Sequence, residues 1–281
     1  MTAAERHEDA RPATARVGAV PRSLVRAEPS ALRRLLPPLL ALTVTLAVWE
    51  AVVRATGVPD YLVPAPSGIG AVLARDPGRF AAAGFTSLIE ALAGLTVGTG
   101  AAFAAAVVMA HSRPLERALY PLALLVKVTP VVAVAPLFII WFGFGALPKV
   151  LIAALITFFP MLVNAVTGLR SVSPAALDAF RALDASAWQT FRLLRVPASL
   201  PYVVAALKIS IPLSLIGAVV AEWMSGDSGV GQIILIANSS LDTASLFAAV
   251  VVLAVLAVAL TGAVALVERR TLSWHESAEE A

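Results

Sequence analysis

The motif Gly226-Asp227-Ser228-Gly229 has the Gly-x-Ser-Gly spacing of intramembrane serine proteases, in which the serine attacks a peptide carbonyl. Serine is a weak nucleophile without a neighbouring base, and this class of protease needs a histidine from a later membrane span. The only histidine after the motif is His275, close to the end of the chain. We therefore interpret the motif as a turn in a loop.

Metal and nucleotide chemistry also lack their usual residues. The chain has no cysteine, and its three histidines, His7, His111 and His275, lie outside the apolar runs. A phosphate-binding loop of the type Gly-x-x-x-x-Gly-Lys-Ser/Thr needs glycine directly before its lysine. The only lysines follow other residue types: they are Lys127, Lys149 and Lys208, after Val126, Pro148 and Leu207. We therefore expect no catalytic residue, metal or cofactor on this chain, and any ATP must be bound by another protein.

Charged residues inside apolar runs are the next candidates for function. Glu90, Lys127 and Lys208 fall in such runs, where charge is costly unless it is paired or faces water. We expect Glu90 to reach the nearby outer membrane surface, and the long side chain of Lys208 to extend to the inner one. Lys127 lies deeper, and we place it on a path through the membrane.

The elements that hold these residues are predicted to be membrane-spanning helices. Hydrophobic residues make up 59% of the 281 residues, charged residues 14%, and the mean hydropathy is +0.86, which is typical of an integral membrane protein. A hydrocarbon core about 30 Å thick needs about 20 apolar residues in a helix. Six runs are long enough, near residues 35–53, 86–110, 118–142, 150–168, 203–222 and 246–267. The expected fold is an all-α, polytopic membrane protein with six transmembrane helices.

The basic residues orient these helices. The flanks on one side carry 15 lysines and arginines, seven of them in the N-terminal tail, and the flanks on the other side carry four. Both tails, 1–34 and 271–281, are therefore predicted to be cytoplasmic, the first one disordered, with the six-span domain at 35–270. The loops 54–85 and 223–245 then face outward, and Ser67 is expected to cap a short helix in the first loop. A net charge of +3 suits such flanks, so no nucleic-acid partner is inferred.

The third run is interrupted by Pro121, Pro130 and Pro136, which free backbone carbonyls that must be buried in protein or line a cavity. Broken helices shape the path in many transporters, although prolines also make ordinary kinks. We place Pro130 on the path together with Lys127. Asn164, in the fourth run, either lines the path or forms an interhelical hydrogen bond.

Glycines in the second run indicate close helix packing. Gly94, Gly98 and Gly100 stand among alanines and form small-residue faces that let another helix approach. We expect them to pack inside the protein, with a subunit interface as the alternative.

A polar segment, residues 171–201, lies between the fourth and fifth runs. Ser173 followed by Pro174 is a helix-start signal, and Ser186 and Gln189 have the spacing of a capping box. These signals predict two short helices, one over residues 175–183 and a second running from Ser186 to about residue 195. Any cytoplasmic loop can contain one amphipathic helix, but two capped helices indicate a docking site for a partner protein.

The ends of these two helices are also marked. The joint between them falls at Asp184, where a left-handed residue is expected because a tight turn follows the first helix. Pro197 and Pro201 are predicted to stop the second helix and to turn the chain into the next span.

The polar segment resembles the coupling motif of permease subunits of ATP-binding-cassette importers, in which Glu-Ala-Ala is followed by three residues, a glycine and, further on, Leu-Pro. Asp178-Ala179-Phe180 stands at the Glu-Ala-Ala positions, Asp184 at the glycine and Val196-Pro197 at the apolar-proline pair. Ala185-Ser186 also matches. Three residues depart from the pattern: Asp178 is shorter than glutamate, Phe180 replaces a small residue and Asp184 replaces glycine.

The resemblance extends from about Leu36 to Arg270, and it is closest to the nitrate, sulfonate and taurine branch, which also contains permeases for pyrimidine-type thiamine precursors and for riboflavin. The stretches that carry it are residues 63–67, 135–145, 168–172, 221–223 and 228–231. It implies a permease subunit, not an enzyme, that forms a path for a small solute across the bacterial cytoplasmic membrane.

The resemblance also implies partners: a second copy of the permease, two ATPase subunits that bind the ATP, an extracytoplasmic substrate-binding protein and the membrane lipid. The residues that it implies in ATPase coupling are Asp178, Ala179, Phe180, Asp184, Ala185, Ser186 and Pro197. The alternative is a secondary transporter driven by an ion gradient, which would often show inverted repeats and acidic ion sites at mid-membrane. The sequence shows neither feature.

Overall fold

The computed structural model describes residues 31–271, with the side chains of residues 36–270. Nearly all of the predicted tails 1–34 and 271–281 therefore lies outside the described part. Every regular element within it is helical, which confirms the all-α prediction. The chain divides into two units, residues 1–48 and 49–281, and helix α1 (Ala31–Thr56) passes from the first unit into the second.

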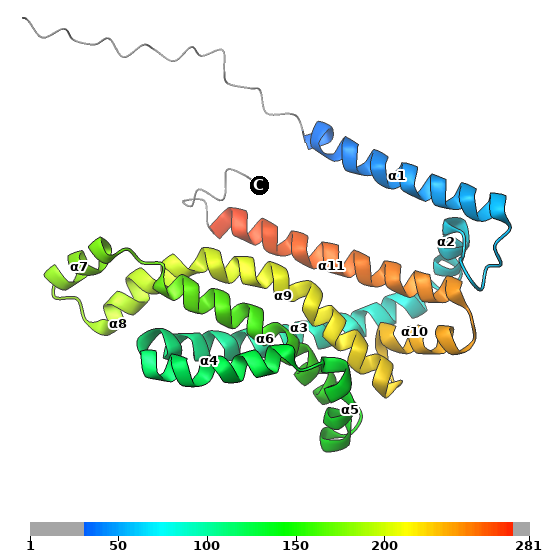
Figure 1. Cartoon of the computed structure of the whole chain (residues 1–281). Helices are drawn as coiled ribbons and strands as arrows, with labels where there is room; N and C mark the ends of the chain where they lie inside the picture. Colours follow the sequence, from blue (N-terminus) through cyan, green and yellow to red (C-terminus); the bar gives the residue numbers. More distant parts are fainter. Residues whose placement is uncertain (1–30, 272–281) are drawn as a thin grey trace, which may run out of the picture. The chain divides into compact units, whose positions relative to one another are not determined.

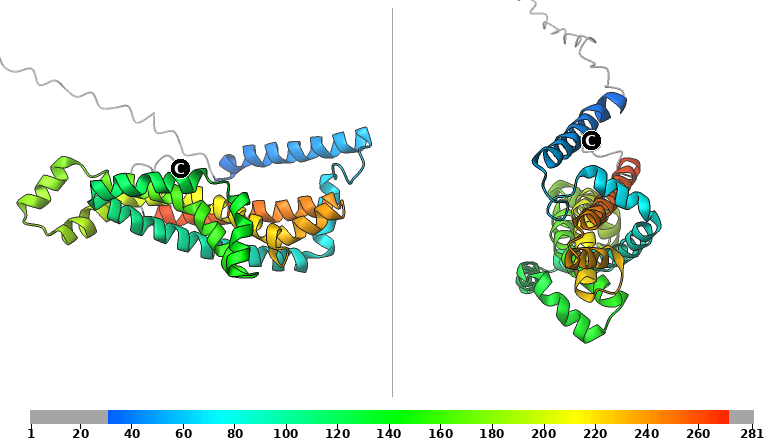
Figure 2. Two further views of the ribbon diagram at one scale, coloured as in Figure 1. Left: turned by 60° about the horizontal axis from the view of Figure 1, so that its bottom comes forward. Right: turned by 90° about the vertical axis from the view of Figure 1, so that its right-hand side faces the viewer.

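In the second unit, four long helices run side by side: α3 (Pro77–His111), α6 (Ala146–Arg170), α9 (Val196–Ser225) and α11 (Thr243–Thr271) (Figures 1 and 2). Two short helices, α2 (Pro66–Arg75) and α10 (Gly229–Ser239), pack at one end of this bundle. Among the described residues, five helices are long and apolar enough to cross a membrane: α1, α3, α6, α11 and the continuous helix that contains α9.

The predicted third span is a bent pair of helices. Helix α4 (Arg113–Val128) and helix α5 (Val131–Phe142) meet at an angle of 96°, so the pair counts as one span only if the bend is included. Thr129 is extended, as expected for a residue before proline, and Pro130 has no amide with which to continue α4. Pro121 and Pro136, by contrast, lie inside helices. Only one of the three prolines thus breaks the span.

The first outer loop contains the expected short helix, but its capping differs from the prediction. Helix α2 begins at Pro66 after Ala65, and no side chain caps it. Ser67 instead donates two hydrogen bonds to Glu50 of α1, from its amide (3.0 Å) and from its hydroxyl (2.7 Å). Proline at the first helical position leaves one fewer amide to satisfy, which frees Ser67 to tie α2 to α1.

The centre of the bundle is the packing of α3 against α6 and of α6 against α9. A β-carbon at Gly94 would collide with Ala153, one at Gly98 with Thr157, and one at Gly217 with Ala153. Lipid chains are as apolar as leucine, so membrane helices associate through such close approach more than through hydrophobic exclusion. The expectation of internal packing is confirmed for Gly94 and Gly98.

Gly98 and Gly100 lie on the same helix and form a matched pair, because a β-carbon at Gly100 would have no neighbouring atom within 4 Å. We expect Gly98→Ala to destabilise the protein by about 1–3 kcal/mol, because α3 and α6 must separate. Gly100→Ala should be neutral or slightly stabilising, since alanine favours a helix. The measurement is the melting temperature of both variants in detergent, and equal shifts would contradict the assigned packing.

Candidate functional site

The polar segment 171–201 folds into the two predicted helices. Helix α7 (Pro174–Ala182) starts after Ser173, whose hydroxyl accepts a hydrogen bond from the Ala176 amide (3.3 Å). Helix α8 (Ala187–Thr190) begins with the complete capping box: Ser186 Oγ accepts from the Gln189 amide (3.2 Å), and Gln189 Oε1 accepts from the Ser186 amide (2.7 Å). Both helix starts are therefore confirmed.

The turn between α7 and α8 is held by backbone hydrogen bonds. Asp184 is left-handed with φ 51°, as predicted for the joint. Its amide donates to Arg181 O (3.0 Å), and the amide of Ala185 donates to Phe180 O (3.0 Å), which is the double bond of a Schellman motif. Aspartate tolerates this conformation better than most residues, so the departure from glycine leaves the turn intact.

The second predicted boundary is wrong, because the chain stays helical past Pro197 and Pro201. A π-helical turn, Phe191–Arg195, follows α8 and leads directly into α9, so that one helical stretch runs from Ala187 to Ser225. In this turn the Val196 amide donates to Phe191 O, five residues back. The wider turn lies directly before Pro197, so the helix continues past a proline that has no amide to donate.

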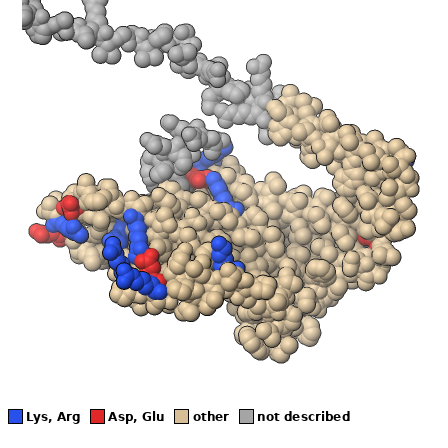
Figure 3. Space-filling model, viewed as in Figure 1, with Lys and Arg blue, Asp and Glu red and all other residues tan. Residues whose placement is uncertain are grey.

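The α7–α8 pair presents mixed chemistry at its surface. Asp178 is exposed and accepts a hydrogen bond from Arg181 (2.9 Å), while Leu183, Trp188 and Leu193 are 78%, 64% and 62% exposed. Phe180 is partly buried. On the face shown in Figure 3, charged side chains gather around the end where α7 and α8 lie. The exposed leucines beside charge suit a protein-binding surface, whereas Trp188 lines a groove together with Val107 and Val108 of α3.

A buried ionic cluster lies at the opposite end of the bundle, near the starts of α6 and α10. The Lys149 ammonium group is 1% exposed and contacts three groups: Asp227 Oδ1 (2.7 Å), Glu90 Oε1 (3.2 Å) and Ser228 Oγ (2.6 Å). Lys149 belongs to α6, Glu90 to α3, and the other two residues to the turn between α9 and α10. Three parts of the chain are thus joined by one buried charge.

Glu222, at the end of α9, holds the first turn of α10. Its carboxylate is fully buried and accepts hydrogen bonds from Ser87 Oγ (2.6 Å) and from the Gly231 amide (2.7 Å). The same Ser87 hydroxyl accepts from the Val230 amide (2.9 Å). Amides at a helix start lack intrahelical partners and favour a negative charge, so Glu222 satisfies α10 directly. A β-carbon at Gly229 or Gly231 would collide with Glu222, which explains both glycines.

The cluster corrects one expectation about charge. Glu90 was expected to reach the outer surface, but it is buried and paired with Lys149. A partner charge on another helix stabilises a carboxylate in an apolar span. Lys208 lies outside the cluster and forms a partly exposed ion pair with Glu268 in the last turn of α11, so its predicted extension to the inner surface stays a prediction.

The turn interpretation of the Gly226–Gly229 motif is supported by its geometry. Gly226 ends α9 in the left-handed conformation, and Ser228 accepts a hydrogen bond from the charged Lys149, which leaves the serine without a base. Partial burial raises the pKa of Asp227, but hydrogen bonds from Lys149 and Ser225 outweigh it and hold this pKa below its usual value. Asp227 is therefore a charged partner for Lys149 near neutral pH.

The predicted path residues lie apart from both sites. Lys127, at the end of α4, is exposed, and its ammonium group lies 4.9 Å from the centre of the Phe159 ring. Pro130 is exposed at the α4–α5 bend. An apolar cavity of about 330 Å³ lies beside the bend, between Val126, Phe138 and residues of α3 and α6. These features leave Lys127 and Pro130 as predictions for the path.

Asn164 is partly buried on α6, and its side-chain amide donates to Pro160 O (2.8 Å) within the same helix. The expected interhelical hydrogen bond is thus replaced by an intrahelical one. A short polar side chain four residues after a carbonyl reaches it without any help from a neighbouring helix. The assignment of Asn164 to the translocation path stays a prediction.

Sequence reasoning missed Lys149 and Glu222 as site residues. Lys149 was named only among the lysines that exclude a phosphate-binding loop, and Glu222 lay within the stretch 221–223 that carries the family resemblance. A usable signal existed, because the predicted orientation puts Glu90, Lys149 and Glu222 at the same side of the membrane. Opposite charges at the same depth of neighbouring spans are expected to pair.

The chain resembles known membrane transport proteins. Residues 94–273 match the model of a family described as binding-protein-dependent transport system inner membrane component. The riboflavin transport system permease protein RibX of Chloroflexus aurantiacus is 35% identical over 246 residues, covering 85% of this chain and 92% of that protein. The formylaminopyrimidine transport permease protein ThiX of Halalkalibacterium halodurans is 31% identical over 245 residues, covering 86% and 96%.

One further relative and one solved structure are also similar to this chain. A putative aliphatic sulfonates transport permease protein, SsuC of Bacillus subtilis, is 33% identical over 193 residues, covering 69% of this chain and 70% of that protein. Among solved structures, an inward-facing form of the MetNI methionine ABC transporter aligns with a TM-score of 0.56, covering 67% of this chain and 94% of the other. At 18% sequence identity, this second likeness concerns the fold alone.

We expect Lys149→Met to destabilise the protein by about 3–5 kcal/mol, because it leaves the buried Glu90 carboxylate without its counter-charge. Lys208→Met is the matched control: its ion pair with Glu268 is partly exposed, so the loss should be about 1 kcal/mol or less. Melting temperatures in detergent measure both. The double variant Glu90→Gln/Lys149→Met should recover part of the loss, and a double variant no more stable than Lys149→Met would contradict the ion-pair explanation.

Proposed function

The chain belongs to the family of binding-protein-dependent transport system inner membrane components, and we propose that, as the permease subunit of an ATP-binding-cassette importer, it couples solute transport to a separate ATPase through the polar segment 171–201. The observation that carries this proposal is the pair of capped, exposed helices α7 and α8. Helix α8 continues without a break into the membrane helix α9. The family relatives named above are transport permeases.

The continuity of the helix supplies the mechanical part of the proposal. The helical stretch from Ala187 to Ser225 contains 39 residues, which corresponds to roughly 58 Å at 1.5 Å per residue. It begins beside the proposed docking surface, and its last turn contains Glu222, next to the buried ionic cluster. A movement of α7 and α8 would therefore reach the far end of the bundle as a rigid-body displacement.

In this mechanism the ATPase subunits bind the ATP, and their closure moves the polar segment. Asp178, Ala179, Phe180, Asp184, Ala185, Ser186 and Pro197 are the proposed coupling residues. Asp178 offers a carboxylate to an arginine or a backbone amide of the ATPase. Phe180 is bulkier than the residue that the family motif places there, so the receiving groove must have matching room.

The remaining assembly follows the family pattern. A second copy of the permease would complete the path, and a substrate-binding protein would meet the loops 54–85 and 223–245 on the outer side of the bacterial cytoplasmic membrane, with both termini cytoplasmic. Lipid would surround the apolar helices. The buried cluster around Lys149 would then lie directly beneath the surface that receives the binding protein, at the opposite end of the bundle from the ATPase.

The solute is proposed to be a small molecule of the sulfonate, nitrate, taurine or pyrimidine-type thiamine-precursor class. The riboflavin and formylaminopyrimidine permeases align over 85% and 86% of this chain, whereas the sulfonate permease aligns over 69%. This difference in coverage favours a nitrogen heterocycle as the transported solute. Mass spectrometry of the ligand that co-purifies with the partner binding protein tests this preference, and a sulfonate there would overturn it.

The docking proposal predicts that Asp178→Arg lowers both ATPase co-purification and solute uptake on the order of tenfold or more, because like charges facing each other across an interface cost several kcal/mol. The loss of the Asp178–Arg181 pair within α7 costs only about 0.2–0.5 kcal/mol, so unfolding of the helix does not explain such an effect. Asp60→Arg, the same charge reversal at an exposed site in the other loop, should leave ATPase binding unchanged. Normal binding and uptake in Asp178→Arg would refute the docking surface.

The path proposal predicts that Lys127→Met lowers uptake on the order of tenfold while ATPase co-purification stays normal, because a charge along the path is replaced by an apolar group. Uptake of labelled solute into reconstituted vesicles measures the effect. Lys208→Met makes the same chemical change on α9 and serves as the control. Unchanged uptake in Lys127→Met would remove Lys127 from the path.

A further inference from the structure

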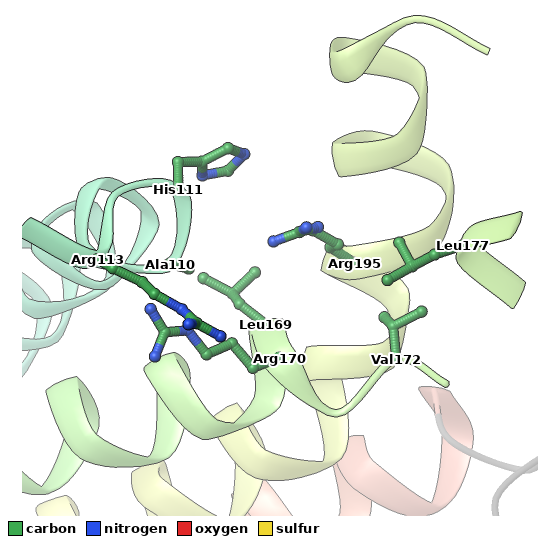
Figure 4. A pocket seen from close by; sticks show the side chains of 8 residues that line it. All are labelled: Ala110, His111, Arg113, Leu169, Arg170, Val172, Leu177 and Arg195. Carbon is green, nitrogen blue, oxygen red and sulfur yellow. The ribbon is translucent and has the colours of Figure 1, made fainter. Parts of the chain in front are cut away.

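A cavity at the end of the bundle that carries α7 and α8 is lined by three arginines. Its volume is about 430 Å³, and Arg113 enters it from the start of α4, Arg170 from the end of α6 and Arg195 from the π-helical turn. Figure 4 shows the side chains of Arg113 and Arg195 pointing toward the hollow from opposite sides. No acidic residue of the described part lines the cavity, so the wall carries a strong positive charge.

Only one of these arginines is neutralised within the described residues. Arg170 donates to Glu116 (2.7 Å) and to the backbone carbonyl of Met109 (2.9 Å), which fixes it at the end of α3. The side chains of Arg113 and Arg195 form no ion pair or hydrogen bond with any residue of the described part. Two guanidinium groups that converge without a counter-charge repel each other, and an anion between them would remove this repulsion.

An apolar groove adjoins the charged cavity. It has a volume of about 420 Å³ and is lined by Val107, Val108, His111, Trp188 and Phe191, together with Ala187. His111 borders both hollows, and its ring lies 5.4 Å from that of Phe191, which in turn lies 5.6 Å from Trp188. Tryptophan is enriched where a membrane meets water. The two hollows together form an amphiphilic site, with one charged part and one apolar part.

We propose that this composite site binds an anionic phospholipid, with the phosphate between Arg113 and Arg195 and an acyl chain along the groove beside Trp188. The charge selects the phosphate, since guanidinium groups match its geometry with paired hydrogen bonds. The adjoining groove selects a lipid over free phosphate, because only a lipid carries an apolar chain next to its charge. Basic pockets between helix ends on the cytoplasmic side are recognised places for such head groups.

The lipid would support the polar segment from the membrane side. Arg195 and Phe191 lie in the π-helical turn that joins α8 to α9, so a bound lipid would contact the joint through which the proposed movement passes. The site rests on the proposed orientation, which puts this end of the bundle at the cytoplasmic face of the membrane, and not on ATPase binding. It would survive the loss of ATPase docking, and the two proposals fail independently.

The test uses the full chain with Trp188 as its sole tryptophan, reconstituted with lipids that carry bromine on an acyl chain and quench nearby tryptophan. Brominated phosphatidylglycerol should quench Trp188 at a concentration on the order of tenfold lower than brominated phosphatidylcholine. Arg113→Gln/Arg195→Gln should abolish this preference. Arg117→Gln/Arg192→Gln removes two exposed arginines from the same two elements without touching the cavity, and it should keep the preference.

Two outcomes would overturn the site: equal quenching by both lipids in phosphate-free buffer, which would leave the arginines to a free anion, or equal loss of the preference in both double variants. If Arg113→Gln/Arg195→Gln lost ATPase co-purification but kept the lipid preference, the cavity would belong to the ATPase interface. Should the sole-tryptophan chain fail to fold, native mass spectrometry of the lipids retained by the unaltered chain and both double variants gives the same comparison.

Discussion

The buried ammonium group of Lys149 connects three parts of the chain through ionic and hydrogen-bond contacts. Its neighbours Glu90 and Asp227 come from α3 and from the turn after α9, so a single cation fixes the start of α6 against two other elements. In a low-dielectric interior, separating these charges is costly, and their relative positions are held accordingly. Glu222 and Ser87 extend the restraint to the first amides of α10. Helices α3, α6, α9 and α10 thus meet through polar contacts at this end of the bundle.

Close packing also fixes α3 and α9 against α6 along the length of the bundle. Gly94 and Gly98 bring α3 against α6, and Gly217 brings α9 against α6, so the three helices that share the ionic cluster also touch over much of their length. The continuous helix from Ala187 to Ser225 then links this end to the polar segment. At one end of the molecule, a buried ammonium group is paired with carboxylates, and the buried Glu222 accepts hydrogen bonds from Ser87 and from the Gly231 amide. At the other end, charged and apolar side chains are exposed, and two arginines lack a counter-charge among the described residues, which suits an end that meets partners and lipid.

The helix signals of the polar segment were readable because each depends on neighbours in sequence. Ser173, Ser186 and Gln189 each accept a hydrogen bond from an amide three residues away, and the left-handed Asp184 follows the end of α7. Proline was a weaker guide. Pro130 breaks a helix, whereas Pro197 and Pro201 do not: a π-helical turn directly precedes Pro197, and Pro201 lies inside the continuing helix α9. Whether a proline ends a helix depends on what surrounds it.

The sequence by itself determined the class of protein, its apolar helices, the helix caps and the family resemblance, since these follow from transfer free energies and from contacts within a few residues. Only the tertiary structure decided which charges pair. Lys149 meets Glu90 and Ser228 across 59 and 79 residues of sequence, and Ser87 meets Glu222 across 135. Such pairs form because the spans pack in one particular order, and a single sequence does not encode that order in any local pattern. The convergence of Arg113 and Arg195 on one cavity was decided by the same packing.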